Sequence, residues 1–172
     1  MIILADAEAT RAAGLALAKW FQARLQAAID SAGSQLHLSG PLGAGKTTLV
    51  QGLLAGFGHR GAVRSPSYAL LESYQFDGFE VHHFDLYRLS DPEELEFIGA
   101  REYFSQSALC IFEWPERASN WLPSPTLAIA LDYHSCTEQR ASGASDDFQR
   151  SLEISSIALD RATLDALEAS LS

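Results

Sequence analysis

Apolar and polar residues follow one another along the chain in an order that predicts alternating helices and strands. Between residues 8 and 28, apolar side chains recur every three or four positions with charges between them, which indicates an amphipathic helix. Short apolar runs at 35–39 and 108–113 indicate buried strands, and residues 48–57 indicate a second helix. This order is typical of an α/β protein.

The middle and end of the chain predict antiparallel additions to this core. Two β-prone runs, 68–76 and 79–85, are separated by Asp77-Gly78, a strong signal for a two-residue hairpin. The remaining expected elements are a capped helix running from Asp91 towards Ile98, strands at 126–133 and 149–156, a loop at 134–149 and a short amphipathic helix at 160–171.

Residues 40–47 read GPLGAGKT and match the phosphate-binding pattern G-x-x-x-x-G-K-[ST]. Glycines let backbone NH groups turn towards phosphate, and the helix that follows points its positive end at the same anion. Lys46 would reach the β and γ phosphates, and Thr47 would ligate magnesium. The motif predicts a nucleoside triphosphate ligand with Mg²⁺. Together with the element order it predicts one P-loop NTPase-like domain over residues 1–172, a three-layer α/β fold whose mainly parallel sheet carries antiparallel hairpin additions.

Composition narrows the expected partners and compartment. A formal charge of −10 disfavours direct binding to a nucleic-acid backbone, so any nucleic acid would be reached through a partner. The first residues lack a basic region before an apolar core, and no apolar run approaches the roughly 18 residues of a membrane span. Cys110 and Cys136 lack metal-ligand spacing, and Cys110 is best interpreted as a small buried residue. We expect a cytoplasmic protein that is neither exported nor embedded in a membrane.

Two carboxylates stand at the ends of predicted strands, where nucleotide sites of open α/β sheets are built. These are Asp85 and Glu113. Either could hold magnesium directly or through water, and Glu113 could instead orient an attacking water. Strand-end acids are also often simply solvated, and the pattern does not divide these roles.

The strand that ends at Asp85 carries further polar residues. Alternation places His83, Asp85 and Tyr87 on one face, which suits a polar network beside phosphate. At most one of His82 and His83 would face the nucleotide, and a satisfied or exposed side chain is the favoured interpretation of His82. Arg88 could pair with Asp85 or a phosphate, or form a surface ion pair of little energetic weight.

Four segments in this order resemble the bacterial TsaE family: GAGKTT at 43–48, SPSY at 65–68, HFDLYR at 83–88 and EWPE at 113–116. The resemblance covers roughly residues 8–133. It implies a small ATPase required for making threonylcarbamoyladenosine at position 37 of tRNAs that read codons beginning with A. It further implies an accessory protein that acts on a transferase complex of TsaB and TsaD subunits and reaches tRNA only through that complex.

The resemblance also implies roles for individual residues. Thr47 and Glu113 become magnesium-site residues, with Asp85 as a second acidic group at the metal, and Lys46, Glu113 and Asp85 form the catalytic set. Residues 65–68 become a nucleotide-responsive switch. Nucleotide contacts are expected from Leu42, Gly43, Ala44, Gly45, Lys46, Thr47, Thr48, Ser67 and Trp114.

Two positions depart from the family's motifs, and a third has two possible roles. Pro41 replaces the Asp or Asn common in the family's loop and removes one backbone donor. Ser67 replaces the usual Thr of the switch but retains the hydroxyl. For Trp114, a packing aromatic is at least as good an interpretation as a place beside the nucleotide.

A GTPase is disfavoured by the residues, whereas a small-molecule kinase stays the main enzymatic alternative and a nucleotide-gated interaction protein a third. A GTPase would need an Asn-Lys-x-Asp type element, but the only lysines are Lys19 and Lys46. A small-molecule kinase shares the loop but usually has an arginine-rich lid, whereas Arg101 and Arg117 are isolated. A nucleotide-gated interaction protein with negligible hydrolysis differs only in turnover. We expect weak ATPase activity alone, because no arginine finger or complete set of catalytic bases is evident.

Overall fold

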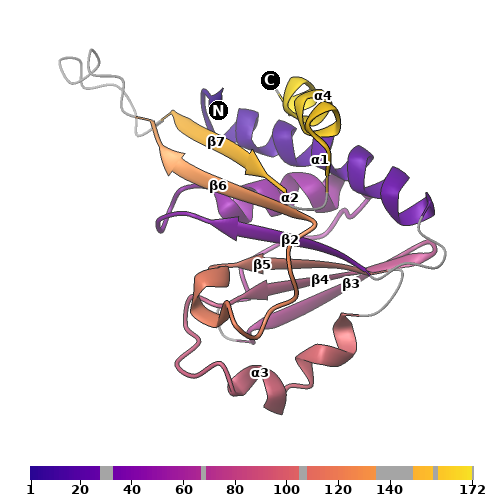
Figure 1. Cartoon of the computed structure of the whole chain (residues 1–172), viewed down its shortest axis with the longest axis vertical. Helices are drawn as coiled ribbons and strands as arrows, with labels where there is room; N and C mark the ends of the chain where they lie inside the picture. Colours follow the sequence, from indigo (N-terminus) through magenta and orange to yellow (C-terminus); the bar gives the residue numbers. More distant parts are fainter. Residues whose placement is uncertain (28–32, 67–68, 105–107, 135–148, 157–158, 172) are drawn as a thin grey trace.

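A computed structural model describes residues 1–27, 33–66, 69–104, 108–134, 149–156 and 159–171. Within these residues the chain forms a seven-stranded sheet in the order β1-β7-β6-β2-β5-β4-β3, with helices on both sides (Figure 1). The strands are β1 (Ile2–Leu4), β2 (Ser34–Ser39), β3 (Leu71–Phe76), β4 (Phe79–Asp85), β5 (Ala108–Glu113), β6 (Leu127–Tyr133) and β7 (Arg150–Ser155).

The centre of the sheet is parallel and its edges are antiparallel. Strand β2 pairs in parallel with β5 and β6, and β4 pairs in parallel with β5. The β3–β4 hairpin adds one antiparallel edge, and β7 adds the other by pairing with β6 and β1. The α/β fold with a parallel core and a hairpin addition is therefore confirmed.

The helices form two layers around this sheet. On one side lie α1 (Ala7–Ala27), α2 (Lys46–Gly56) and α4 (Arg161–Leu171). On the other lie α3 (Glu94–Phe97) and the 3₁₀ helices η1 (Ala100–Tyr103) and η2 (Pro115–Ala118). Each side has its own apolar cluster of buried side chains.

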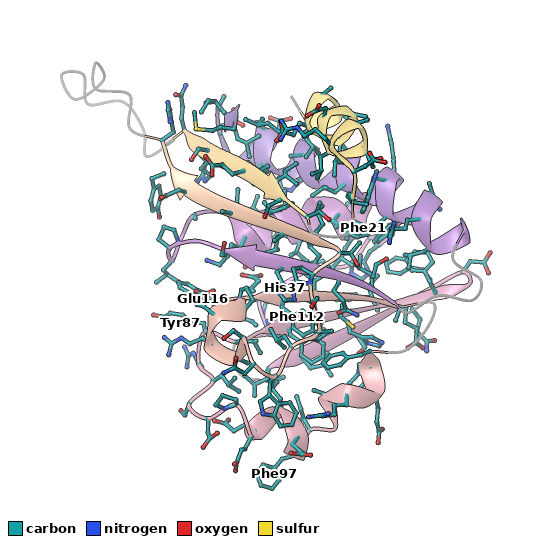
Figure 2. The ribbon with its side chains drawn as sticks, viewed as in Figure 1. Phe21, His37, Tyr87, Phe97, Phe112 and Glu116 are labelled. Atoms are coloured by element: carbon teal, nitrogen blue, oxygen red, sulfur yellow. The ribbon has the colours of Figure 1, made fainter. Side chains whose placement is uncertain are left out.

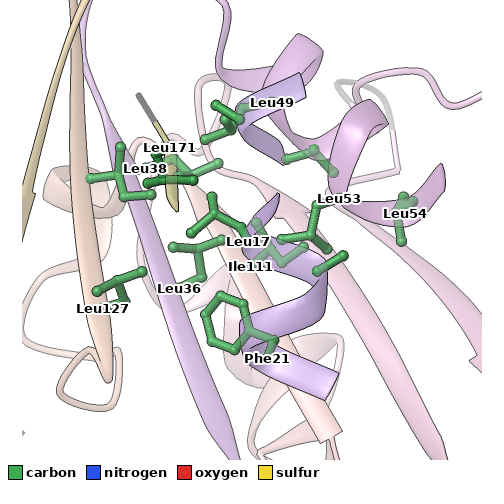
Figure 3. Packing of buried hydrophobic residues seen from close by; sticks show 14 of the residues in the cluster. Leu17, Phe21, Leu36, Leu38, Leu49, Leu53, Leu54, Ile111, Leu127 and Leu171 are labelled. Carbon is green, nitrogen blue, oxygen red and sulfur yellow. The ribbon is translucent and has the colours of Figure 1, made fainter. Parts of the chain in front are cut away.

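The larger cluster fixes the helices that carry the phosphate-binding loop. Leu17 and Phe21 of α1 pack with Leu36 of β2 and Ile111 of β5, and Leu53 of α2 joins the same group (Figure 3). All five side chains have no measurable exposure. Burial of each such side chain stabilises the fold by about 1.5–3 kcal/mol. This packing holds α2, and with it the end of the phosphate-binding loop, against the sheet.

Several element boundaries differ from those expected. Helix α2 begins at Lys46 rather than 48, and β3 begins at Leu71 rather than 68. The expected helix from Asp91 towards Ile98 is α-helical only over Glu94–Phe97. Part of the expected capping box is present, because Glu94 accepts hydrogen bonds from the backbone NH groups of Ser90 and Asp91, while the Asp91 side chain accepts one from the NH of Glu93. Most of the loop expected at 134–149 lies outside the described residues.

Strand β1 was not expected, because three residues carry too little alternation to indicate a strand. It forms by pairing with β7, where Ile2 lies opposite Leu152. In the described part of the chain, none of the helices combines the length and apolar character needed to cross a membrane.

Candidate functional site

The parallel centre of the sheet brings the predicted site residues to one edge. Leu38 of β2 lies opposite Glu113 of β5, and Glu113 lies opposite Asp85 of β4. The phosphate-binding loop leaves the end of β2 and enters α2 at Lys46. The structure therefore places Asp85 and Glu113 opposite one another at the strand ends, next to the phosphate-binding loop.

The loop backbone begins with a glycine in a conformation that other residues adopt only with strain. Gly40 has φ of 129°, and a β-carbon there would lie 1.9 Å from the carbonyl oxygen of Leu131. Pro41 lacks an NH group, but its carbonyl accepts hydrogen bonds from the backbone of Ala44 and from Lys46. The departure at Pro41 therefore leaves the loop with internal hydrogen bonds.

Lys46 lies almost entirely inside the site. Its Nζ atom donates to the carbonyl oxygens of Gly40 at 2.7 Å and Pro41 at 2.9 Å. It also lies 3.9 Å from the ring centroid of Trp114. Burial lowers the pKa of Lys46, while the negative charges of Glu113, Glu116 and Asp85 act in the opposite direction.

Glu113 is the centre of a buried polar cluster. Its Oε1 atom accepts a hydrogen bond from Thr47 Oγ1 at 2.9 Å and pairs with His83 Nε2 at 2.9 Å. Thr47 Oγ1 also lies 3.2 Å from Oε2. The hydroxyl of Thr47 thus donates a hydrogen bond to Glu113, and its oxygen lone pairs stay available to another partner.

Asp85 forms the second acidic position. Its Oδ1 atom accepts a hydrogen bond from the backbone NH of Tyr87 at 3.0 Å, and its Oδ2 atom accepts one from the Ser65 hydroxyl. The side chain is buried. Ser65 belongs to the segment 65–68 expected to respond to nucleotide, so this segment is tied to the acidic edge of the site.

A cavity of about 360 Å³ joins these groups. It is lined by Leu42, Gly43, Gly45, Lys46, Thr47, Thr48, Ser65, Asp85, Tyr87, Arg88, Glu113 and Trp114. Of the expected nucleotide contacts, Ala44 is buried and does not line the cavity, and Ser67 lies outside the described residues. Figure 2 labels Tyr87, which lines the cavity, at one end of the central strands.

Three lining residues were not among the predicted site residues, and one of them is Ser65, which was expected only as part of the switch. Tyr87 and Arg88 were recognised as part of a polar strand end but were not placed among the nucleotide contacts. The strand periodicity already put Tyr87 on the face of Asp85, and this signal was sufficient to include it. Trp114 lines the cavity and also packs against the second apolar cluster, so its packing role does not exclude a place beside the nucleotide.

The two adjacent histidines point to opposite faces of β4, as alternation predicted. His83 pairs with Glu113 inside the site. His82 lies on the other face, where its Nδ1 atom is 2.9 Å from Ser73 Oγ and its Nε2 atom is 3.3 Å from Glu80. Only His83 therefore belongs to the site.

The residues present fit a magnesium ion. A threonine hydroxyl and two carboxylates are hard oxygen donors of the kind that Mg²⁺ prefers. Among the described residues, no three His, Cys, Asp or Glu side chains are grouped to form a complete metal site. Mg²⁺ usually takes one or two carboxylates from the protein and completes its shell with water and substrate phosphates. Thr47, Glu113 and Asp85 would be the groups to hold it.

Comparison with known proteins gives a consistent answer. The family model described as "Threonylcarbamoyl adenosine biosynthesis protein TsaE" matches residues 4–142. The TsaE protein of Haemophilus influenzae is 50% identical over 99 residues, which cover 58% of this chain and 63% of that protein. The TsaE protein of Nostoc is 35% identical over 136 residues, covering 77% of each chain.

A solved structure extends the similarity to nearly the whole chain. The crystal structure of YdiB from Bacillus subtilis aligns with a TM-score of 0.64 and 25% identity, covering 99% of this chain and 91% of that one. In sequence, the chain spans a little under two thirds of the Haemophilus relative. Because the family model covers most of its length, the chain belongs to the TsaE family.

Proposed function

We propose that this protein binds ATP with Mg²⁺ and hydrolyses it as an accessory protein in the biosynthesis of threonylcarbamoyladenosine at position 37 of tRNA. The observation that carries the proposal is the hydrogen bond from Thr47 to Glu113 next to the phosphate-binding loop. It joins the loop's hydroxyl to a strand-end carboxylate in one cavity, which is the arrangement that magnesium-dependent phosphoryl transfer needs.

Each group in the cavity has a defined task in this proposal. The loop backbone and the ammonium of Lys46 bind the phosphates. Thr47, with Asp85 and Glu113 directly or through water, holds Mg²⁺, which neutralises charge on the phosphate oxygens. Glu113 would also orient the attacking water, a role supported by its position at the end of β5, where it lines the cavity and can accept a hydrogen bond.

The proposed partner is a transferase complex of TsaB and TsaD, with tRNA reached only through it, in the cytoplasm. The charge of −10 supports this, since a direct contact with tRNA would call for clustered cations. Arg101 lies over the Trp121 ring at 4.5 Å and does not line the cavity, so it offers no arginine-rich lid. We expect the protein alone to hydrolyse ATP weakly, because the partner would be needed to order the catalytic groups of the site.

The test is steady-state hydrolysis of ATP and GTP by the purified protein, alone and with purified TsaB and TsaD. Lys46→Ala is the blank, and Lys19→Ala is the matched control, because Lys19 is the only other lysine and is exposed on α1. We expect weak hydrolysis of ATP that rises with the partners, is lost in Lys46→Ala and persists in Lys19→Ala.

Other outcomes separate the alternatives. Tight ATP binding without turnover, even with the partners, would indicate a nucleotide-gated interaction protein. Turnover unaffected by the partners would point to a self-contained enzyme and a search for a phosphoryl acceptor. Unchanged ATP affinity in Lys46→Ala would remove the cavity as the nucleotide site.

A further inference from the structure

The pair formed by His83 and Glu113 is the most deeply buried polar contact of the site. Neither side chain has more than 4% of its surface exposed, and His83 Nε2 lies 2.9 Å from Glu113 Oε1. The two residues come from neighbouring parallel strands, β4 and β5, so the backbone sheet fixes both ends of the contact. A polar pair in such a place must be hydrogen-bonded to be tolerated.

The two oxygens of Glu113 have different surroundings. Oε1 accepts from Thr47 and His83, each at 2.9 Å. Within the described part of the chain, Oε2 has only the longer contact with Thr47, at 3.2 Å. A carboxylate oxygen can accept about two hydrogen bonds, so Oε1 is fully used while Oε2 keeps capacity for a water or a cation.

The surroundings of Nδ1, the second ring nitrogen of His83, indicate that the proton is carried by Nε2. Nδ1 is buried and has no hydrogen-bond partner. With the proton on Nε2, the ring donates to the carboxylate and leaves only a lone pair at Nδ1. The alternative tautomer would bury an N–H group without an acceptor and place a lone pair against Oε1, which is the costlier arrangement.

We infer that His83 is a positioning residue of the nucleotide site: its Nε2–H group holds Oε1 of Glu113 so that Oε2 faces the magnesium position. The inference rests on the proposed function. His83 does not line the cavity, so its role would be exerted through Glu113 rather than by direct contact with nucleotide or metal. Outer partners that orient a ligating carboxylate typically change metal affinity or activity by 10- to 100-fold when removed.

The experiment measures binding of a non-hydrolysable ATP analogue by calorimetry, once with Mg²⁺ and once with EDTA. His83→Asn shortens the side chain so that its amide does not reach Oε1, whereas His83→Gln places an amide NH near the position of Nε2. His82→Asn is the matched control, because His82 is the adjacent buried histidine and faces away from the site.

We expect the gain in affinity given by Mg²⁺ to fall about tenfold in His83→Asn, with binding in EDTA unchanged. The gain should be retained in His83→Gln and in His82→Asn. An undiminished gain in His83→Asn, or an equal loss in His82→Asn, would overturn the inference and leave the proposed function intact. Failure of the unmodified protein to bind the analogue at all would instead overturn the proposed function and this inference with it.

A second measurement needs no substitution and covers the case in which His83→Asn does not fold. The imidazole nitrogen spectrum of the unmodified protein, recorded by NMR, should show the Nε2–H tautomer for His83. An Nδ1–H tautomer would overturn the inference, because the ring could then not donate to Glu113.

Discussion

The ammonium group of Lys46 lies 3.9 Å from the centroid of the Trp114 ring, and the centroids of the Trp114 and Tyr87 rings are 5.0 Å apart. A cation over an aromatic face is favourable by about 0.5–2 kcal/mol, depending on how dry the site is. The Trp114 ring and the carbonyl groups of Gly40 and Pro41 therefore contact the Lys46 ammonium group. In our proposal, the phosphates of the nucleotide would bind this same group.

Trp114 should accordingly report nucleotide binding through its fluorescence. When phosphates attract the Lys46 ammonium, the ring loses or changes its nearest charge, so we expect the intensity or wavelength of its emission to shift on adding ATP with Mg²⁺. The measurement uses a Trp20→Phe, Trp121→Phe double variant, in which Trp114 is the remaining tryptophan.

The same titration on that background with Lys46→Ala is the control, and it should show no change. If calorimetry detects binding while the emission of Trp114 stays constant, the ring does not sense the phosphates and the contact with Lys46 persists in the bound state.

Glu113→Gln should separate binding from turnover. The amide keeps the shape of the side chain, and therefore avoids leaving His83 beside a cavity, but removes the negative charge at the end of β5. We expect partner-stimulated ATP hydrolysis to fall by at least about 100-fold, the lower range for loss of a proton-accepting group, with ATP binding partly retained. Unaltered turnover would remove Glu113 from the catalytic set. Asp85→Asn, assayed in parallel, divides the roles that the sequence leaves open.

The meeting of Thr47, Asp85 and Glu113 was predictable from the sequence because it follows from strand order. Each acid ends a predicted strand, and the carboxyl ends of parallel strands share one edge of a sheet. Local rules of the same kind predicted the β3–β4 hairpin from Asp77-Gly78, and the burial of Cys110 from its apolar surroundings. Burial raises the pKa of Cys110 to about 12. Cys136 lies outside the described residues.

Contacts that depend on the path of a loop were not predictable. Trp114 reaches Lys46 because its backbone turns left-handed, with φ of 61°, immediately after β5. No residue pattern signals such a turn at a tryptophan, so packing and ligand contact were equal interpretations beforehand. Similarly, Ser65 meets Asp85 across 20 positions of chain, and β1 exists only because β7 lies beside it.

Gly40 and Gly58 should differ sharply when replaced by alanine. Both have positive φ, 129° and 98°, which costs about 1–2 kcal/mol for a residue with a β-carbon. A β-carbon at Gly58 meets nothing within 4 Å, whereas one at Gly40 overlaps the carbonyl of Leu131. We expect Gly40→Ala to lower the free energy of unfolding by roughly 1–3 kcal/mol more than Gly58→Ala, measured by urea denaturation. Equal losses would mean that the loop relaxes freely away from β6.

His37 should make the protein less stable in mild acid. Burial lowers its pKa from 6.5 to about 4, partly offset by a hydrogen bond with the backbone of Pro123. Because the unfolded chain binds the proton more readily than the folded one, the stabilisation from neutral His37 is complete above pH 6.5 and is lost as pH falls towards 4. The loss amounts to roughly 2 kcal/mol by pH 5.

His37→Phe removes the titrating group but keeps a ring against Phe112, which contacts His37 edge to face. Burial also lowers the pKa of His82, but that residue is present in both proteins and cancels in the comparison. Urea denaturation at pH 7 and pH 5 should therefore show a smaller acid loss in His37→Phe than in the unmodified protein. Parallel losses would mean that His37 takes up its proton in the folded state without penalty.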